Sequence, residues 1–410
     1  MNSSLPYFVG LDIGTSAVRC VIGVLPDGES VPSVIGFGSA VNRGMRKSTI
    51  SHIDDVVEAI SQAIGEAEKI AGVTVDRATA NLGGAHIEGV NSRGVIAIST
   101  SSHEITIEDR ERVESAATII QMPPNRDIIQ VFAKSYRLDG QESIKDPVGM
   151  HGVRLEVDTH IVTASTPAIR SMDSALERAR VLSPSYTTSG LADAEAVLTR
   201  SQKESGTAII DIGAGSTSMV VMEDGEVQHV AVIPIGGINM TNDLAIGLRT
   251  DLEIAEAVKV QFGDLKTTKS KKMIKVRHDG RDHEFELSDV QMILSARAEE
   301  LFEFVDKELK KINKSKKLPG GVVLTGGVAS LPGLSEFAKE ELELPSRVGK
   351  LLEIGGIADK LGDQHYTTAV GLMWLDMLIG QHNDSANTGA KGIGSMWSAV
   401  RGSFGSFGKK

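Results

Sequence analysis

Two stretches of the chain share one pattern of apolar runs and tight turns. Residues 7–13 (YFVGLDI) form an apolar run that ends in a carboxylate and a glycine turn, and residues 17–25 form a second run. The turn signal Asp27-Gly28 then leads into a third run, VPSVIGFGSA. Apolar runs joined by such short turns predict three antiparallel strands arranged as two hairpins.

The same unit occurs again in the second half of the chain. Residues 207–213 (TAIIDIG) again end in Asp-Ile-Gly, and they are followed by SMVVMEDGEV with its Asp224-Gly225 turn and by VQHVAVIPIGG. One Asp-Ile-Gly alone means little, but a matched order of three elements indicates an internal repeat. We therefore expect two similar lobes that face each other.

The pattern between and after these copies predicts helices and one insertion. Apolar positions recur at helical spacing over residues 51–72. Residues 84–163 combine strand-like stretches with one helix near 107–120 and predict a small α+β insertion. Further helices are expected near 167–182, 190–201, 288–313 and 366–379, with a hairpin turning at Asp279-Gly280.

Composition places the chain among globular proteins. Its 410 residues suggest two or three domains, and 41% hydrophobic with 24% charged residues are ordinary globular values. A formal charge of -11 argues against a nucleic-acid backbone as the main partner. The single cysteine, Cys20, cannot form an intrachain disulfide, and no His/Cys cluster is spaced for zinc.

The sequence shows neither a signal peptide nor a membrane-spanning apolar run. The first residues lack the basic and apolar regions of a signal peptide, and no apolar run reaches the roughly 18 residues needed to cross a bilayer. We expect a cytoplasmic protein whose membrane contact is peripheral.

Both repeats carry residues suited to holding phosphate. A strand delivers a carboxylate, and the following glycines and hydroxyl residues let the backbone N–H groups converge on an anion. A carboxylate beside phosphate requires a cation, so Asp12 and Asp211 are interpreted as Mg²⁺ ligands acting through water. The alternative is that each sequence is merely a hairpin turn. The candidate residues are Asp12, Gly14, Thr15 and Ser16 in the first turn, and Asp211, Gly213, Ala214, Gly215, Ser216 and Thr217 in the second.

Two further features suit the nucleoside part of a nucleotide. LTGGVASLPG (324–333) places a third glycine turn, Gly326-Gly327, between a strand and a helix. Glu256 and Lys259 stand three residues apart on an expected helix and so share one face, where they could hold ribose hydroxyls. The alternative for this pair is a solvent-exposed ion pair.

The last residues form an amphipathic pattern after a small, polar stretch at 380–391, whose composition is typical of a flexible linker. An apolar face with Trp and Phe anchors and basic residues nearby is typical of a helix that lies in a bilayer interface. A disordered end or a peptide that docks on a partner remains the alternative. The residues concerned are Ile393, Met396, Trp397, Val400, Phe404 and Phe407 on the apolar face, with Arg401, Lys409 and Lys410.

These motifs together resemble a known superfamily. The two Asp-Ile-Gly hairpins, AEAVK and the LTGG turn are similar to the phosphate and adenosine motifs of the ATPases that include actin, sugar kinases and heat-shock chaperones. The stretches SGLADAEAVLTRSQKESGTAIIDIGAGSTSMVV and IPIGGINMTNDLAIGLRT, with the detached tail, resemble more closely the bacterial cell-division family FtsA. The resemblance covers most of the chain.

The resemblance implies an α/β fold, namely an actin-like two-lobed fold with duplicated ribonuclease-H-like subdomains and an inserted α+β subdomain. It divides the chain into 1–83 with 164–190 and 363–380 (subdomain 1A), 84–163 (1C), 191–244 with 318–362 (2A), 245–317 (2B), a linker at 381–391 and a membrane-targeting helix at 392–410.

The resemblance also implies a function. The FtsA family binds ATP with Mg²⁺, polymerises head to tail on the inner face of the cell membrane at the division site, and tethers FtsZ filaments there while recruiting other division proteins. Relatives often carry a carboxylate where this chain has Ser218, so we expect ATP binding with slow or negligible hydrolysis.

A basic region is the candidate FtsZ-binding surface, because the family holds the acidic C-terminal peptide of FtsZ in subdomain 2B. Arg297 and Lys272 are the residues assigned to that contact. A solvated lysine-rich face is the alternative. The basic residues are Lys266, Lys269, Lys271, Lys272, Lys275 and Arg277, with Lys310, Lys311, Lys314, Lys316 and Lys317 near the end of the expected helix 288–313.

Other members of the superfamily offer competing interpretations. A PilM-type pilus-assembly adaptor shares the fold and the inserted subdomain but gives no reason for the tail. A small-molecule kinase needs a catalytic base and a substrate pocket, for which the sequence offers no motif. A chaperone needs a large substrate domain after the last core helix, and only about 30 residues follow it here.

Overall fold

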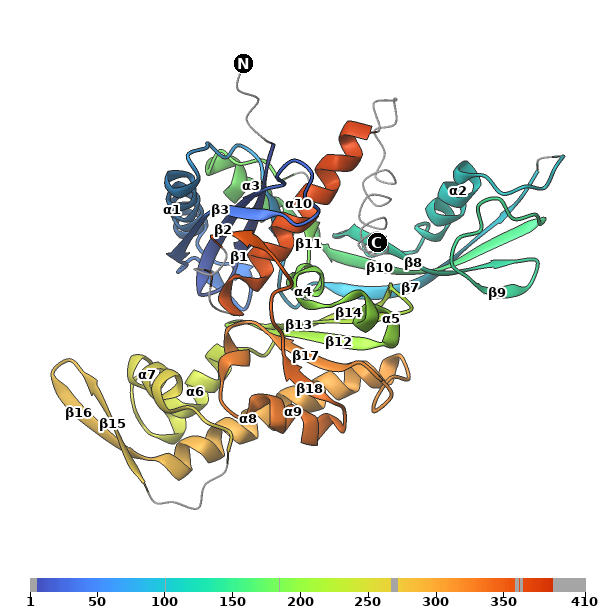
Figure 1. Cartoon of the computed structure of the whole chain (residues 1–410). Coiled ribbons are helices and arrows are strands. Elements are labelled where there is room, and N and C mark those ends of the chain that lie inside the picture. Colours follow the sequence, from blue (N-terminus) through green and yellow to red (C-terminus); the bar gives the residue numbers. More distant parts are fainter. Residues whose placement is uncertain are drawn as a thin grey trace.

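Two mixed β-sheets, one in each lobe, form the centre of the molecule (Figure 1). The structure, a computed structural model, describes residues 6–99, 101–183, 185–266, 272–357, 361 and 364–385, with side chains as far as Ile379. The first sheet has the order β11-β6-β1-β2-β3-β19 and the second the order β14-β13-β12-β17-β18.

The strands of the first sheet are β1 (Tyr7–Ile13), β2 (Ala17–Val24), β3 (Ser33–Val41), β6 (Thr79–Asn81), β11 (Tyr186–Thr187) and β19 (Gly355–Gly356). Those of the second sheet are β12 (Thr207–Ile212), β13 (Thr217–Glu223), β14 (Glu226–Ile233), β17 (Gly321–Thr325) and β18 (Ser346–Val348).

The two sheets share one topology. In each, three antiparallel strands are followed by two strands that run parallel to the first, so that β1, β6 and β11 correspond to β12, β17 and β18. The predicted repeat of three strands is confirmed, and the structure extends it to five. Duplicated lobes explain why two similar turns, one after β1 and one after β12, come to face each other.

Helices cover both sheets. Helix α1 (Ile53–Ala71) packs on β3, and its predicted end at Gly72 is confirmed by a left-handed φ of 71° there. Helix α10 (Thr367–Ser385) packs on β1. The remaining helical elements of the described cores are α3 (Thr166–Arg178), α4 (Ser189–Val197), α5 (Arg200–Ser205), η1 (Gly327–Ser330), α9 (Leu334–Leu342) and η3 (Gln364–Tyr366).

Helix α4 connects the lobes. It packs on α10 of the first lobe and on β12 and β13 of the second. The approach to α10 is so close that a Cβ added at Gly371 would lie 1.9 Å from the carbonyl oxygen of Ala192. Only glycine fits at this crossing.

The insertion between β6 and β11 is a separate small subdomain that extends away from the two lobes (Figure 1). Helix α2 (Ile107–Ala117), which starts with a capping box at Thr106, packs on a sheet of order β7-β10-β8-β9. The predicted α+β character of residues 84–163 is confirmed. Its strands are β7 (Glu88–Ala97), β8 (Arg126–Leu138), β9 (Gln141–Ile144) and β10 (Arg154–Ser165).

Between β14 and β17, the second lobe carries a helical subdomain with a protruding hairpin (Figure 1). The hairpin turns at Asp279-Gly280 as predicted. The elements are α6 (Gly237–Gly247), α7 (Leu252–Phe262), β15 (Met273–His278), β16 (Arg281–Glu286) and α8 (Leu287–Lys311). A second, much shorter hairpin, β4 (Met45–Arg46) with β5 (Thr49–Ile50), belongs to the first lobe.

Two expected boundaries differ from the structure. Residues 355–356 pair with β3 in the first sheet, so the chain returns to the first lobe before the expected end of subdomain 2A at 362. Helix α10 continues to Ser385, into the segment expected to be a linker from 381. Within the described residues, none of the helices combines the length and apolar content that crossing a bilayer requires.

Candidate functional site

A cavity of about 610 Å³ lies between the two lobes, and the predicted phosphate turns line it from opposite sides. Its walls also include the start of α6, one face of α7 and the turn after β17. All but one of the residues predicted to bind the nucleotide are brought together here: Asp12, Gly14, Thr15, Ser16, Asp211, Gly213, Ala214, Gly215, Ser216, Glu256, Lys259, Gly326 and Gly327.

The two turns are closed by equivalent backbone hydrogen bonds. In the first, the N–H of Gly14 donates to the carbonyl of Ala17 at 3.0 Å, and in the second the N–H of Gly213 donates to the carbonyl of Ser216 at 3.0 Å. The second turn is also fixed to α6, because the carbonyl of Gly213 accepts from Gly237 N at 2.9 Å. Equivalent turns therefore present equivalent backbone to one cavity.

Thr217 departs from the expectation. It is fully buried, and its hydroxyl donates to the carbonyl of Ile235 at 2.8 Å instead of facing the cavity. It is the first residue of β13, and side chains alternate along a strand, so the last residue of a turn need not point the way the turn does.

Asp12 is buried at the end of β1 and held by two partners. Asn81 Nδ2 donates to Asp12 Oδ1 at 2.7 Å, and Arg19 Nη1 lies 3.8 Å from Asp12 Oδ2. Burial raises the pKa of the Asp12 carboxyl, while the charge of Arg19 and the hydrogen bond from Asn81 oppose that rise.

Asp211 lies in a cluster of buried carboxylates. Burial and the negative charge of Asp12 raise the pKa of Asp211 to about 7. Asp193, on α4 behind the cavity, is fully buried and accepts from Thr325 Oγ1 at 2.7 Å. Its own pKa is raised by burial and by the charge of Asp211. Such a cluster is electrostatically unfavourable when fully ionised, unless a cation accompanies it.

Sequence reasoning missed Arg19, Asn81 and Asp193. Arg19 could have been found, because the tight turn after Asp12 places it directly opposite on β2, with Asp12 and Arg19 as register partners. The equivalent partner of Asp211 is Ser218. Its hydroxyl accepts from Gly190 N at 3.1 Å and stands outside the cavity lining. The two turns thus differ in the charge that faces each carboxylate.

Glu256 and Lys259 form a close ion pair, with Lys259 Nζ 2.6 Å from Glu256 Oε2. The pair is more than an exposed contact, because Lys259 Nζ also donates to the carbonyl of Gly237 at 3.1 Å and to Thr241 Oγ1 at 2.8 Å. Lys259 therefore ties α7 to the start of α6 at the edge of the cavity.

The donor set suits Mg²⁺ better than a soft metal. Carboxylate oxygens and hydroxyls are hard ligands, and Mg²⁺ usually keeps several waters beside one or two carboxylates. Among the described residues, no group of three or more His, Cys, Asp and Glu side chains is arranged to hold a metal ion. A Mg²⁺ ion at Asp12 and Asp211 would therefore depend on water and on a bound phosphate for its other ligands.

Most of the described cations of the basic region have partners of opposite charge. Arg297 on α8 makes a two-pronged contact with Asp243 on α6, at 2.5 and 2.9 Å, and a second ion pair with Glu300. Lys272 is exposed, and Lys269 and Lys271 lie outside the described residues. Ion pairs are formed by Lys275 with Glu284, Lys310 with Asp306, Lys311 with Glu308, Lys314 with Glu223 and Lys316 with Glu343.

The tail predicted to contact a membrane, residues 392–410, lies outside the described residues, as do residues 386–391 of the expected linker.

Comparison with protein families matches most of the folded chain. A model described as "SHS2 domain inserted in FTSA" matches residues 84–163, and one described as "Cell division protein FtsA" matches residues 208–371. The first match has the bounds expected for the insertion. Among curated proteins, the cell division protein FtsA of Neisseria meningitidis is 36% identical over 378 residues, which cover 91% of each chain.

Solved structures show the same fold at low identity. A PilM–PilN type IV pilus biogenesis complex aligns with a TM-score of 0.63 and 16% identity, covering 90% of this chain and 97% of that one. MreB5 of Spiroplasma citri bound to ADP aligns with a TM-score of 0.56 and 11% identity, covering 93% of this chain and 99% of that one. At these identities the likeness concerns the actin-like fold alone.

Proposed function

This chain belongs to the FtsA family of cell-division proteins, and from that premise we propose that it binds ATP, polymerises on the inner face of the cell membrane and tethers FtsZ filaments there. The observation that carries the nucleotide part is the pair of equivalent turns, one from each lobe, that line a single cavity with two buried carboxylates. A hairpin turn that served only to reverse the chain would need neither the matching carboxylate nor the opposing copy.

In this proposal the hydroxyls and backbone of the two turns hold the phosphates, and Glu256, Lys259, Gly326 and Gly327 face the nucleoside. Asp12 and Asp211 hold Mg²⁺ through water. The ion supplies the positive charge that lets two carboxylates stand beside a phosphate chain. The pocket size agrees, since small-molecule sites range over about 300–1,000 Å³.

Calorimetric titration tests the proposed binding of MgATP. MgATP should bind the full-length chain, and removal of Mg²⁺ with EDTA should weaken the binding strongly, because the carboxylates and phosphates would then repel. A matched pair of variants, Asp211→Asn in the site and Asp224→Asn at the tip of the β13–β14 turn, separates the site from a general charge effect. No measurable MgATP binding by the wild type would refute the nucleotide assignment.

Hydrolysis is expected to be slow or negligible. Ser218 stands opposite Asp211 where relatives often carry a carboxylate, and its hydroxyl is engaged by the backbone of Gly190. Steady-state phosphate release as fast as that of a metabolic kinase would contradict this expectation.

The proposed FtsZ contact lies on the helical subdomain of the second lobe. Lys272 offers an exposed charge at the base of the β15–β16 hairpin, and the carbonyl of Lys272 accepts from Leu287 N, at the start of α8. Arg297 would have to share its guanidinium between the acidic peptide and Asp243. The acidic peptide would therefore meet one exposed cation, Lys272, and one that is shared with Asp243.

The proposed membrane contact is made by residues 392–410 as an amphipathic helix. One such segment binds weakly, because its glycines disfavour a helix in water. A head-to-tail filament would array many tails on one anionic surface and raise avidity by orders of magnitude. Weak single anchors are therefore compatible with a protein that acts as a polymer.

Deletion of residues 392–410 tests the anchor. The truncated protein should lose sedimentation with anionic liposomes while keeping MgATP binding, since the cavity lining that the structure describes consists of residues 12–368. Electron microscopy on a lipid monolayer with ATP then tests polymerisation. Liposome sedimentation that survives the deletion would remove the membrane-anchor assignment.

A further inference from the structure

The β4–β5 hairpin reaches the phosphate turns through its tip. The hydroxyl of Ser48 lies 3.1 Å from Thr15 Oγ1 and 2.7 Å from Ser216 Oγ, and the backbone N–H of Ser48 donates to Thr15 Oγ1 at 3.0 Å. Thr15 belongs to the first turn and Ser216 to the second. Ser48 therefore joins the two lobes at the point where their turns meet.

This contact is built with tight and unfavourable backbone geometry. Lys47 and Ser48 both have left-handed φ, 49° and 58°, in a two-residue hairpin turn that favours Asn-Gly. On the facing turn, a Cβ at Gly215 would come within 2.5 Å of Thr15 Oγ1 and 3.1 Å of Ser48 N. Ser48 thus holds a backbone conformation that is costly for a non-glycine residue while it packs against a glycine across the cleft.

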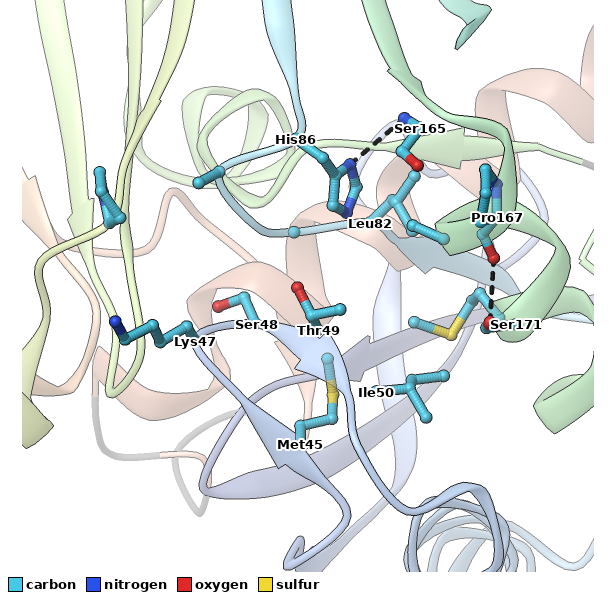
Figure 2. A pocket seen from close by; sticks show the side chains of 15 residues that line it. Met45, Lys47, Ser48, Thr49, Ile50, Leu82, His86, Ser165, Pro167 and Ser171 are labelled. Atoms are coloured by element: carbon cyan, nitrogen blue, oxygen red, sulfur yellow. Dashed lines mark hydrogen bonds between the residues drawn. The ribbon is translucent and has the colours of Figure 1, made fainter. Parts of the chain in front are cut away.

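Ser48 also forms part of the wall between two cavities. It lines the cavity between the lobes and a second cavity of about 460 Å³, which extends from the hairpin to the start of α3. In Figure 2, Ser48 and Thr49 line one side of this second cavity, and His86 and Leu82 lie above them in the view. Ser48 is thus shared by the linings of both cavities.

Counting protons gives the chemistry of the three hydroxyls. Two contacts among three hydroxyls use two protons, so one proton is always left, and all three residues line the cavity between the lobes. Thr15 Oγ1 already accepts from the Ser48 N–H, which favours the arrangement in which the Thr15 hydroxyl donates to Ser48 Oγ. In that arrangement Ser48 donates to Ser216, and the Ser216 proton is left for an anion. A hydroxyl that accepts a hydrogen bond donates a stronger one.

We infer that Ser48 is a positioning residue for the terminal phosphate: it orients and polarises the Ser216 hydroxyl, and so favours a nucleoside triphosphate over a diphosphate. This inference rests on the proposed nucleotide site. With the nucleoside at the Glu256–Lys259 end, the terminal phosphate is the group that faces the three hydroxyls. Because Ser48 and Ser216 belong to different lobes, the same contact links phosphate binding to closure of the cleft.

The test compares Mg²⁺ complexes of ADP and of the non-hydrolysable analogue AMPPNP by calorimetry on the full-length chain. The Kd for MgADP divided by the Kd for MgAMPPNP measures the preference for the triphosphate. This ratio should fall about tenfold in both Ser48→Gly and Ser48→Ala. The two variants separate the hydroxyl from the backbone, because glycine relieves the left-handed strain and alanine keeps it. Ser51→Ala is the control, since the Ser51 hydroxyl donates to Gly44 O, away from the cavity.

Each outcome decides a different question. Wild-type protein that binds neither nucleotide refutes the proposed function. If the wild type binds but the ADP-to-AMPPNP ratio of dissociation constants is unchanged or larger in both Ser48 variants, the role of Ser48 alone is overturned. The role is also overturned if the ratio falls in Ser48→Ala but not in Ser48→Gly. In a Ser216→Ala background, Ser48→Gly should change the ratio no further, and an additive effect there also overturns the inference.

Discussion

Arg19 lies directly across the β1–β2 ladder from Asp12, with its Nη1 3.8 Å from Asp12 Oδ2. In the second repeat the corresponding pair is Asp211 and Ser218, so only one of the two carboxylates has a cation opposite it. The duplication has kept the turns and the carboxylates but not the charge balance. In the first lobe the neighbouring strand supplies a counter-charge to the carboxylate, whereas in the second lobe the neighbouring strand supplies none.

Removing that cation should destabilise the protein without ligand. Arg19→Met leaves Asp12 buried without a cation and should lower the free energy of unfolding by about 1–3 kcal/mol in urea titrations without Mg²⁺. Arg200→Met, which breaks an exposed pair with Glu204, should change it by less than about 0.5 kcal/mol. Equal effects of the two substitutions would contradict the importance of the Arg19 contact.

Magnesium nucleotide should bind more tightly as the pH rises through about 7. Burial and Asp12 raise the pKa of Asp211 to about 7, and Mg²⁺ requires the ionised carboxylate. Calorimetry of MgATP from pH 6 to pH 8 should show the increase, and Asp211→Asn should remove most of the pH dependence together with most of the affinity. An affinity that is flat over this range would argue against Asp211 as a ligand of the ion.

The stability of the ligand-free protein should depend on pH in the opposite sense. A folded pKa above the unfolded value stabilises the protein below the unfolded pKa, and this contribution is lost as pH rises through the folded pKa. For Asp211 that window runs from about 4 to about 7. Without Mg²⁺ and nucleotide, Asp211→Asn should flatten the decline of the free energy of unfolding across this window. A decline as steep in the variant as in the wild type would point to other groups.

The junction of the insertion with the second lobe should weaken in acid. His160 Nε2 accepts from Val230 N at 2.9 Å, and Nδ1 is 2.9 Å from Asn91 Oδ1, so the ring is held neutral. Burial, with the nearby His229 and Lys134, lowers the pKa of His160 to about 3. A lowered His pKa gives stability above the unfolded value of about 6.5, and this is lost as pH falls through that value toward the folded pKa.

Hydrogen exchange followed by mass spectrometry measures that junction. Between pH 7 and pH 5, after correction for intrinsic rates, protection of β14 around Val230 should fall in the wild type. His160→Gln, whose amide does not titrate, should show no such pH-dependent fall. Equal pH dependence in the two proteins would exclude His160 as the titrating group.

Charge reversal at the two predicted FtsZ contacts should give different results. Arg297→Glu would place a third carboxylate beside Asp243 and Glu300, so it should lower the free energy of unfolding by a few kcal/mol as well as weaken peptide binding. Lys272→Glu at an exposed position should leave stability within about 0.5 kcal/mol and still weaken binding of the FtsZ C-terminal peptide. Thermal denaturation and fluorescence anisotropy separate the two effects, and unchanged peptide affinity in Lys272→Glu would remove that residue from the contact.

The sequence predicted the parts of this fold that are coded locally. Apolar runs with Asp-Gly turns placed the β1–β2–β3 and β12–β13–β14 hairpins, and helical spacing placed α1 and α8 within a few residues. The two phosphate turns could be paired because the order of elements repeats. The position of Gly326 and Gly327 at the same cavity followed from the strand-to-helix turn that carries them.

The residues that were missed depend on contacts across long separations. Asn81, Asp193 and Ser48 come close to the two turns only after the sheets are assembled, and the local pattern around each residue does not indicate this. The ion pair between Arg297 and Asp243 joins two helices of one subdomain, so the basic pattern alone could not show that this guanidinium is shared. Local pattern predicts the elements, whereas the partners of polar groups are set by topology.

The crossing of α4 and α10 sets the mechanics of the two lobes. Each helix belongs to a different half, and at Gly371 their backbones are in direct contact without a side chain between them. The contact leaves no room for a side chain, so any atom added there has to push the two backbones apart. A bulky residue at position 371 would therefore change the spacing of the two lobes about one helical turn from Thr368, which lines the cavity between them.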